Sequence, residues 1–371
     1  MSTETAGRLS ALELLDWDHL HFYVGNAKQA AHYYATAFGF EIRAYAGPET
    51  GLADRASYLL VQNDLRFVMT SALHPESPIA RHVAAHGDGV HDVALRVSDA
   101  RAAFAATVAG GARAVSPPEE TSDHFGSAVL ATIATYGETV HTFVERDRYK
   151  GPFLPGFIAY AAGARATAAP KLNAIDHCVG NVGWNEMDLW AEYYRSAFSF
   201  TPLVSFDDSD ISTEYTALRS IVMADARRKV KFPINEPAKG LKRSQIEEYL
   251  DFYGGAGVQH VAIATDDIVG AVRALRANGV EFLETPGSYY DGLESRVGHI
   301  AEATGVLREL SILVDRDDLG YMLQIFTKPL QDRPTLFFEI IQRRGSLSFG
   351  KGNFKALFVA IEEEQAKRGN L

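Results

Sequence analysis

The feature that most constrains this chain is an internal repeat. Three stretches of the first half reappear in the same order in the second half. The matched stretches are residues 18–26 with 175–181, 89–95 with 257–263, and 140–146 with 337–343. Three matches in one order make chance a poor explanation, so the sequence predicts two copies of one domain. The length of 371 residues accommodates two domains of ordinary size.

Each copy reads as strands that alternate with single helices. The first matched stretch predicts a strand, an aromatic-rich amphipathic helix and a second strand, and the second precedes a helix at 99–109 or 267–277. A helix that crosses between strands requires mixed or parallel pairing, which favours an α+β architecture. We expect one domain at 1–150, a linker rich in proline, alanine and glycine at 151–172, and a second domain at 173–371.

The second copy also carries an element of its own at the end of the chain. Phe354, Leu357, Phe358 and Ile361 are spaced as one face of a helix, and acidic residues fill the other sides. This pattern predicts a closing helix at about residues 353–368.

Composition excludes several classes of protein. The 36 basic and 47 acidic side chains give a net charge of −11, which argues against a nucleic-acid or anionic-membrane surface. No apolar run reaches the ~18 residues that span a bilayer, and residues 1–15 do not resemble a secretory signal. The single cysteine, Cys178, excludes an intramolecular disulfide and a cysteine-only zinc cluster. We expect a cytoplasmic protein.

Comparison of the two copies singles out three residues of the second. The alignment pairs His177 with Phe22, His260 with Asp92, and Glu339 with Thr142. Two imidazoles and one carboxylate form the usual facial set of a non-haem iron(II) site. A single histidine in a strand is more often structural, but Glu339 lies between Phe338 and Ile340 and there requires a partner or a metal. Taken together, the three residues predict a metal site.

Further motifs resemble one known family over essentially the whole chain. The motifs lie at residues 176–181, 232–237, 257–260, 323–329, 337–340 and 349–358, and they are similar to those of the 4-hydroxyphenylpyruvate dioxygenases. The resemblance implies the vicinal oxygen chelate fold, with two open-barrel domains of paired βαβββ units. It also implies one Fe(II) per chain, held by His177, His260 and Glu339 of the C-terminal domain, whereas the N-terminal domain lacks metal ligands.

The same resemblance implies a substrate pocket and no catalytic residue beyond the metal ligands. Its polar lining would be Ser220, Asn235, Gln245, Gln259 and Gln324, and its aromatic walls Phe326, Phe349, Phe354 and Phe358. Asn353 would begin the closing helix over the site. Phe354 and Phe358 could equally be ordinary contacts of that helix, and Gln245 could be an exposed residue at the start of a helix.

The implied activity converts 4-hydroxyphenylpyruvate and O2 to homogentisate and CO2 in tyrosine and phenylalanine catabolism. It combines oxidative decarboxylation, ring hydroxylation and side-chain migration. Three alternatives stay open: a hydroxymandelate synthase, an extradiol ring-cleaving dioxygenase, and a protein that only binds a metal or small ligand. The family also implies a homo-oligomer, with neither nucleic acid nor a membrane as partner.

Overall fold

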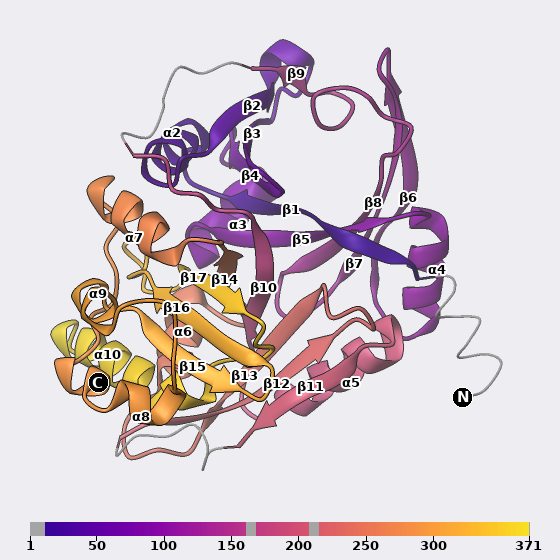
Figure 1. Ribbon diagram of the computed structural model, residues 1–371. Helices are drawn as coiled ribbons and strands as arrows, with labels where there is room; N and C mark the ends of the chain where they lie inside the picture. The colour runs from indigo at the N-terminus through magenta and orange to yellow at the C-terminus, as the bar shows by residue number, and fades with distance from the viewer. Residues whose placement is uncertain (1–11, 161–167, 208–214, 371) are drawn as a thin grey trace.

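Two large mixed β-sheets form the framework of the molecule. The computed structural model describes residues 12–160, 168–207 and 215–370. Figure 1 shows the indigo-to-magenta first half curling above the pink-to-yellow second half. The strands of the first sheet are β1 (Leu14–Tyr23), β2 (Glu41–Ala46), β3 (Arg55–Gln62), β4 (Leu65–Ala72), β5 (Gly89–Val97), β6 (Ala114–Asp123), β7 (Gly126–Ala134), β8 (Val140–Glu145) and β9 (Ile158–Ala159). Those of the second are β10 (Ala174–Asn181), β11 (Thr201–Phe206), β12 (Ala217–Ala224), β13 (Lys231–Ala238), β14 (Gly257–Ala264), β15 (Leu313–Asp317), β16 (Gly320–Phe326) and β17 (Phe337–Arg344).

The order of strands is the same in both sheets. It runs β2-β3-β4-β1-β5-β8-β7-β6 in the first and β11-β12-β13-β10-β14-β17-β16-β15 in the second, and β9 is an extra strand beside β2. Parallel pairs also coincide, since β1–β4 and β5–β8 match β10–β13 and β14–β17. The predicted duplication and the α+β class are therefore confirmed. Each sheet curls into a half-barrel.

Several of the helices begin at residues whose side chains cap them. They are α2 (Ala27–Ala37), α3 (Pro78–His86), α4 (Ala100–Ala109), α5 (Met187–Phe198), α6 (Gln245–Tyr253), α7 (Ile268–Ala277), α8 (Leu293–Val297), α9 (Thr304–Leu310) and α10 (Phe354–Lys367). The side chains of Asp99 and Asp267 accept backbone hydrogen bonds at the starts of α4 and α7. Ser244 and Glu247 form a capping box on α6. None of the helices in the described part of the chain is long and apolar enough to cross a membrane.

Part of the segment expected as a linker adds to the first sheet. β9 pairs with β2, and Phe153 is buried against Ala44, Leu59 and Val68 of that sheet. Apolar side chains at this point of the chain give it a surface to bury, so it packs rather than hanging free. Residues 1–11 of the expected first domain and 161–167 of the expected linker lie outside the described residues.

A β-bulge fixes how the two copies correspond, and it corrects the sequence alignment. The pairing of β1 with β5 skips Asp18 just before His19, and the pairing of β10 with β14 skips Asp176 just before His177. His177 therefore corresponds to His19, and its alignment with Phe22 is wrong. Because the bulge occurs in both copies, it marks equivalent positions, whereas the sequence alignment had matched the Val-Gly-Asn triplets at 24–26 and 179–181.

The other two equivalences agree with the register. Asp92 pairs with the residue two after His19, just as His260 pairs with the residue two after His177. Thr142 of β8 likewise occupies the place of Glu339 in β17. The first copy thus keeps one of the three predicted ligand residues, as His19. It has Asp92 and Thr142 in place of the other two.

Helix α10 covers the open face of the second sheet. Phe358 is buried with Phe206, Leu218 and Ile246, while Ala360 is buried beside Phe326 and Phe337 of the neighbouring strands. Its predicted extent of about 353–368 agrees with the observed Phe354–Lys367, which follows a short 3-10 turn at Lys351–Asn353.

Candidate metal centre

Three adjacent strands bring the predicted ligands together. His177 on β10, His260 on β14 and Glu339 on β17 lie close in space, although 83 and 79 residues separate them in sequence. Glu339 Oε2 lies 3.3 Å from His177 Nε2 and 3.7 Å from His260 Nε2. His177 and Glu339 are buried, with 4% and 3% of their surfaces exposed. Two imidazole nitrogens and a carboxylate oxygen therefore converge on one small volume.

A second layer of residues orients both imidazoles. His177 donates its Nδ1 hydrogen to Asp176 Oδ1 at 2.7 Å, and His260 donates its Nδ1 hydrogen to Gln259 Oε1 at 2.9 Å. Each bond places the hydrogen on Nδ1 and turns the Nε2 lone pair toward Glu339. This is the tautomer that a metal-binding histidine requires, held by the kind of partner that usually accompanies it.

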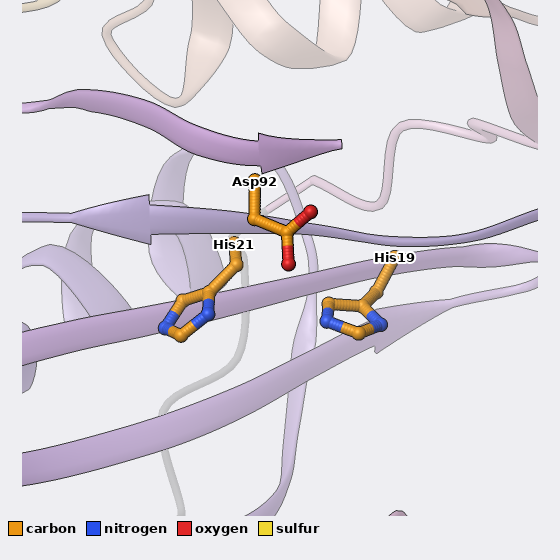
Figure 2. A group of neighbouring side chains, drawn as sticks. All are labelled: His19, His21 and Asp92. Carbon is orange, nitrogen blue, oxygen red and sulfur yellow. The ribbon is translucent and has the colours of Figure 1, made fainter. Parts of the chain in front are cut away.

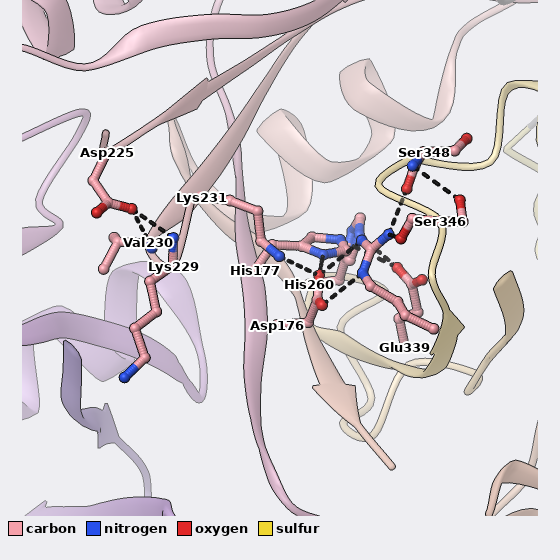
Figure 3. A network of polar contacts seen from close by, with 11 residues as sticks. Asp176, His177, Asp225, Lys229, Val230, Lys231, His260, Glu339, Ser346 and Ser348 are labelled. Carbon is pink, nitrogen blue, oxygen red and sulfur yellow. Dashed lines mark hydrogen bonds and ion pairs between the residues drawn. The ribbon is translucent and has the colours of Figure 1, made fainter. Parts of the chain in front are cut away.

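Asp176 is itself held by two cations (Figure 3). Arg343 forms two hydrogen bonds with its carboxylate, at 2.8 and 2.9 Å, and Lys231 Nζ lies 3.1 Å from Oδ1. Burial by itself would raise the pKa of Asp176, but the hydrogen bonds from His177 and Arg343 and the two positive charges hold that pKa well below its usual range. Asp176 is therefore a carboxylate at any physiological pH.

Arg343 also links the site to the segment that precedes α10. Its Nη1 donates to the carbonyl oxygens of Ser346 and Ser348, at 3.2 and 2.7 Å. The next residue, Phe349, packs edge-on against the His177 ring with centroids 5.2 Å apart. The position of the ligand His177 and that of the closing segment are thus coupled through one arginine.

The electrostatics of the three residues fit a bound cation. Burial disfavours a charged imidazole at His177, but the Glu339 and Asp176 carboxylates together outweigh burial and raise the pKa of His177. Burial and the neighbouring His177 lower the pKa of His260 well below its ordinary value. Glu339 Oε1 is buried and has no hydrogen-bond partner. An unpartnered carboxylate oxygen beside two lone pairs is satisfied when a metal ion lies between them.

The equivalent site of the first half has different chemistry (Figure 2). His19 donates to Asp18 at 2.8 Å and Arg146 also binds Asp18, so the histidine–aspartate–arginine arrangement is duplicated. Asp92 points toward the rings of His19 and His21, in the place that His260 takes in the second half. Here one carboxylate oxygen of Asp92 accepts a hydrogen bond from the backbone nitrogen of Thr142 at 3.0 Å.

The three ligands lie in the wall of a cavity. The cavity is partly open to solvent, and polar and aromatic side chains line it. Besides the ligands, nine of the ten expected pocket residues line it: Ser220, Asn235, Gln245, Gln259, Gln324, Phe326, Phe349, Phe354 and Phe358. The tenth, Asn353, does not line it. Asn353 is fully buried and accepts a hydrogen bond from the Tyr289 hydroxyl at 2.6 Å, so it anchors the start of α10.

Several residues of the cavity wall were missed in the sequence. They are Val179, Phe206, Leu218, Val222, Pro233, Phe337 and Leu357. Phe337 stacks on the His260 ring with centroids 4.8 Å apart. Strand alternation could have identified it, because Phe337 lies two residues before Glu339 and therefore on the same face. No comparable signal marks Phe206, whose contact with Phe354 depends on the path of α10.

This fold and site define a class of protein. A model of the Glyoxalase/Bleomycin resistance protein/Dioxygenase superfamily matches residues 174–310, and a second model of that superfamily matches residues 18–128. Each half of the chain is therefore one glyoxalase-like domain. A fusion protein of a xylose isomerase-like TIM barrel and 4-hydroxyphenylpyruvate dioxygenase shares the fold, with a TM-score of 0.72 at 21% identity over 95% of this chain and 53% of that one.

Curated relatives narrow the class. The 4-hydroxyphenylpyruvate dioxygenase of Yarrowia lipolytica is 50% identical over 96% of this chain and 93% of its own length. The enzyme of that name from Caenorhabditis elegans is also 50% identical, with coverage of 96% and 93%. The chain belongs to the 4-hydroxyphenylpyruvate dioxygenase family. Among solved structures, a triple mutant of 4-hydroxymandelate synthase from Streptomyces coelicolor superposes with a TM-score of 0.86 at 35% identity, over 95% of this chain and 100% of that one.

Proposed function

We propose that this chain converts 4-hydroxyphenylpyruvate and O2 to homogentisate and CO2, with Fe(II) held by His177, His260 and Glu339. One observation carries the proposal: two histidines and a glutamate converge in the wall of a cavity that polar and aromatic side chains line. The chain around that set is about half identical to dioxygenases of this name over nearly its full length. The proposed metal is iron because two imidazoles and one carboxylate on one face are typical of non-haem iron(II) oxygenases.

The protein's part in the reaction is to place the metal and the substrate. Bound iron(II) supplies open coordination positions for the two oxygens of an α-keto acid and for dioxygen. His177 and His260 present their Nε2 atoms because Asp176 and Gln259 hold the opposite nitrogens. Asp176 and its cations further fix the tilt of the His177 ring, so the ligand geometry is set before substrate arrives.

The polar residues of the cavity bind the ends of the substrate. Ser220 and Asn235 lie side by side on paired strands, and Gln324 lies in the wall on β16, each of them nearly buried. Such groups discriminate strongly, because a substrate that lacks the matching hydroxyl or keto oxygen leaves them unpaired. We propose that these residues, with Gln245 and Gln259, hydrogen-bond the phenol and the keto acid.

Aromatic side chains bind the ring and exclude water. Phe326 packs edge-on to His260, while Phe349 and Phe354 enter the cavity from the segment that begins α10. Phenylalanine faces and edges suit a phenyl ring and offer no proton to a reactive intermediate. Helix α10 therefore acts as a lid that shapes the cavity. Asn353 supports this lid through Tyr289 rather than touching the substrate.

The remaining assignments concern organisation and place in the cell. We propose the domain division 1–150 and 173–371 with the connecting segment 151–172, of which β9 and Phe153 attach to the first sheet. We further propose a homo-oligomer in the cytoplasm that acts in tyrosine and phenylalanine catabolism. Analytical ultracentrifugation tests the first part, and a monomer at micromolar concentration would contradict it.

Product analysis separates this proposal from its nearest rival. The full chain is loaded with iron(II) without oxygen, mixed with 4-hydroxyphenylpyruvate and then exposed to O2, and the products are separated by chromatography. Homogentisate with one CO2 per turnover is the expected result. Hydroxymandelate would assign the benzylic oxidation that the solved relative's name describes, and the absence of turnover would contradict both enzyme activities.

A further inference from the structure

A second group of histidines lies outside the cavity lining, at the contact between the two halves. His82 and His86 are four residues apart on α3 and so share one face of that helix. Glu138 reaches them from the turn between β7 and β8. Ligand atoms of these three residues all lie within 4.8 Å of one another, although they were not singled out in the sequence. Both histidines are more than nine-tenths buried.

The hydrogen bonds of His86 fix where its lone pair lies. Its Nδ1 donates to the backbone carbonyl of Tyr253 at 2.6 Å, and a carbonyl oxygen can only accept. In the neutral ring, Nε2 is then a lone pair, and it lies 3.2 Å from Glu138 Oε2. Two acceptors that face each other at this distance repel unless a positive charge lies between them.

Unpartnered nitrogens recur throughout the group. His82 Nε2, His86 Nε2 and His91 Nδ1 are all buried without a hydrogen-bond partner. The His91 ring packs edge-on against His82 with centroids 4.9 Å apart. Buried polar atoms are almost always paired, and of these three nitrogens it is His86 Nε2 that faces the Glu138 carboxylate, where a metal ion would satisfy both atoms.

The surroundings favour neutral imidazoles, the form that binds metals. Burial lowers the pKa of His82 despite its bond to Glu138, and burial lowers the pKa of His91 to about 4. The hydrogen bond from His82 lowers the pKa of Glu138, which is therefore a carboxylate. The Glu138 side chain is 61% exposed and gives an ion a path from solvent.

We propose that His82, His86 and Glu138 bind one divalent transition-metal ion of the zinc class. Two imidazoles and a carboxylate suit zinc, whose bonds of about 2.0–2.2 Å require ligand atoms a little over 3 Å apart. The contacts of 2.8 Å from Glu138 Oε2 to His82 Nδ1 and 3.2 Å to His86 Nε2 approach that separation. When the ion binds, His82 Nδ1 exchanges its hydrogen bond to Glu138 for the metal, and the ring then carries its hydrogen on Nε2. Solvent on the exposed side of Glu138 supplies the fourth ligand.

The site would clamp the two halves together. His86 joins α3 to Tyr253 at the end of α6, and Arg333 donates to the carbonyl oxygens of Ala84 and Ala85 on the same helix. A metal ion bound to His86 would fix the position of this ring. The hydrogen bond from His86 to Tyr253, which joins the two halves at the end of α6, would then be stabilised. We expect zinc at this site to raise the unfolding temperature of the whole chain.

Total metal content tests the site. The full chain is stripped with a chelator, reloaded with one equivalent of iron(II) anaerobically and dialysed against micromolar Zn²⁺, and iron plus zinc is counted per chain. The sum is unaffected if zinc displaces iron from the catalytic site. Two ions are expected for the parent chain, and one for Glu138→Gln and for His86→Gln. The exposed His32→Ala variant is the matched control, with two ions expected.

Each outcome decides the proposal. Loss of one ion in Glu138→Gln supports it even if His86→Gln fails to fold, because Glu138 is at the surface. A single ion in the parent chain overturns it and leaves a shared proton between His86 and Glu138. Two ions retained in Glu138→Gln and in a folded His86→Gln also overturn it, because the second ion then lies elsewhere.

Discussion

His19 and His177 occupy equivalent positions of β1 and β10, and each donates its Nδ1 hydrogen to the aspartate that precedes it. The distances are 2.8 Å to Asp18 and 2.7 Å to Asp176. In both halves an aspartate therefore orients the histidine ring at this position. The halves differ in the residues that lie opposite the ring. Glu339 completes the second site, whereas its counterpart Thr142 forms a hydroxyl bond to Thr132. The candidate iron site therefore lies in the second half, and two changes on neighbouring strands, at Asp92 and Thr142, distinguish the equivalent place in the first half.

Glu339→Gln tests the carboxylate ligand. The side chain keeps its shape but loses its charge, and one of its oxygens has no partner in the metal-free site. We expect iron content and homogentisate formation to be lost, while the unfolding temperature of the metal-free protein does not fall. Metal analysis and calorimetry measure the two effects, with the exposed Glu309→Gln as control. Full iron loading with normal turnover would remove Glu339 from the ligand set.

Asp176→Asn tests the residue behind His177. The amide still accepts the Nδ1 hydrogen but no longer polarises the ring, and Arg343 and Lys231 lose their counter-charge. Loss of such a partner weakens metal binding by roughly 10–100-fold. An iron titration measures this against Asp18→Asn, the counterpart in the first half, for which no change is expected. Equal loss of affinity in the two variants would indicate general destabilisation instead.

Asp92→Asn tests whether the buried Asp92 carboxyl makes the stability of the folded chain depend on pH. Burial raises the pKa of Asp92 to about 6 from an ordinary value of 3.8. Because the folded state binds this proton more tightly than the unfolded state, the carboxylate opposes folding increasingly as pH rises from about 4 to 6, and constantly above that. The shift corresponds to at most about 3 kcal/mol.

The variant removes that penalty. We expect Asp92→Asn to be more stable than the parent chain above pH 6 and equal to it near pH 4, measured by urea unfolding across this range. Asp332→Asn, at an exposed carboxyl, should show no such trend. A variant less stable at pH 7 than at pH 4, relative to the parent, would contradict the burial argument.

Arg368→Ala tests the attachment of the lid. Arg368 binds the carboxylate of Glu248 on α6 with two hydrogen bonds, at 3.1 and 2.7 Å. Without it Glu248 keeps a nearly buried charge with one fewer partner, and the end of α10 loosens. We expect more O2 consumed per homogentisate formed, because a loosened lid admits water to the cavity.

The matched control is Lys367→Ala, whose ion pair with Glu364 lies within α10 itself. This variant should keep the parent ratio of O2 to product. Deletion of the chain after Gly352 should have a larger effect in the same direction as Arg368→Ala, or eliminate product. An unchanged product yield in that deletion would show that α10 is not a lid.

The sequence predicts local structure and the ligand types well. Asp99, Ser244 and Asp267 mark three helix starts because capping depends on residues close in the chain. The repeat reveals His177, His260 and Glu339 together, although their meeting depends on strand order. Which side chains reach the cavity depends on the tertiary packing, and Asn353 accepts a hydrogen bond from Tyr289 instead of lining the cavity.

The sequence comparison chose the wrong register for the first repeated stretch because a short identical triplet lies at different places in the two halves. Val-Gly-Asn occurs in both halves, at 24–26 and 179–181, and aligning these triplets places Phe22 opposite His177. In the structure the first triplet follows β1 and ends in the cap of α2, whereas the second lies inside β10. The pairs Asp18–His19 and Asp176–His177 were the correct signal, since a carboxylate beside a histidine serves the same purpose in both strands.

The central claim is that one iron ion binds between β10, β14 and β17. The most direct test is anomalous X-ray diffraction from crystals of the iron-loaded chain, collected above and below the iron absorption edge. We predict one edge-dependent peak within bonding distance of His177 Nε2, His260 Nε2 and a Glu339 carboxylate oxygen. Fully loaded crystals with no peak among these three atoms, or with iron bound elsewhere, would contradict the account.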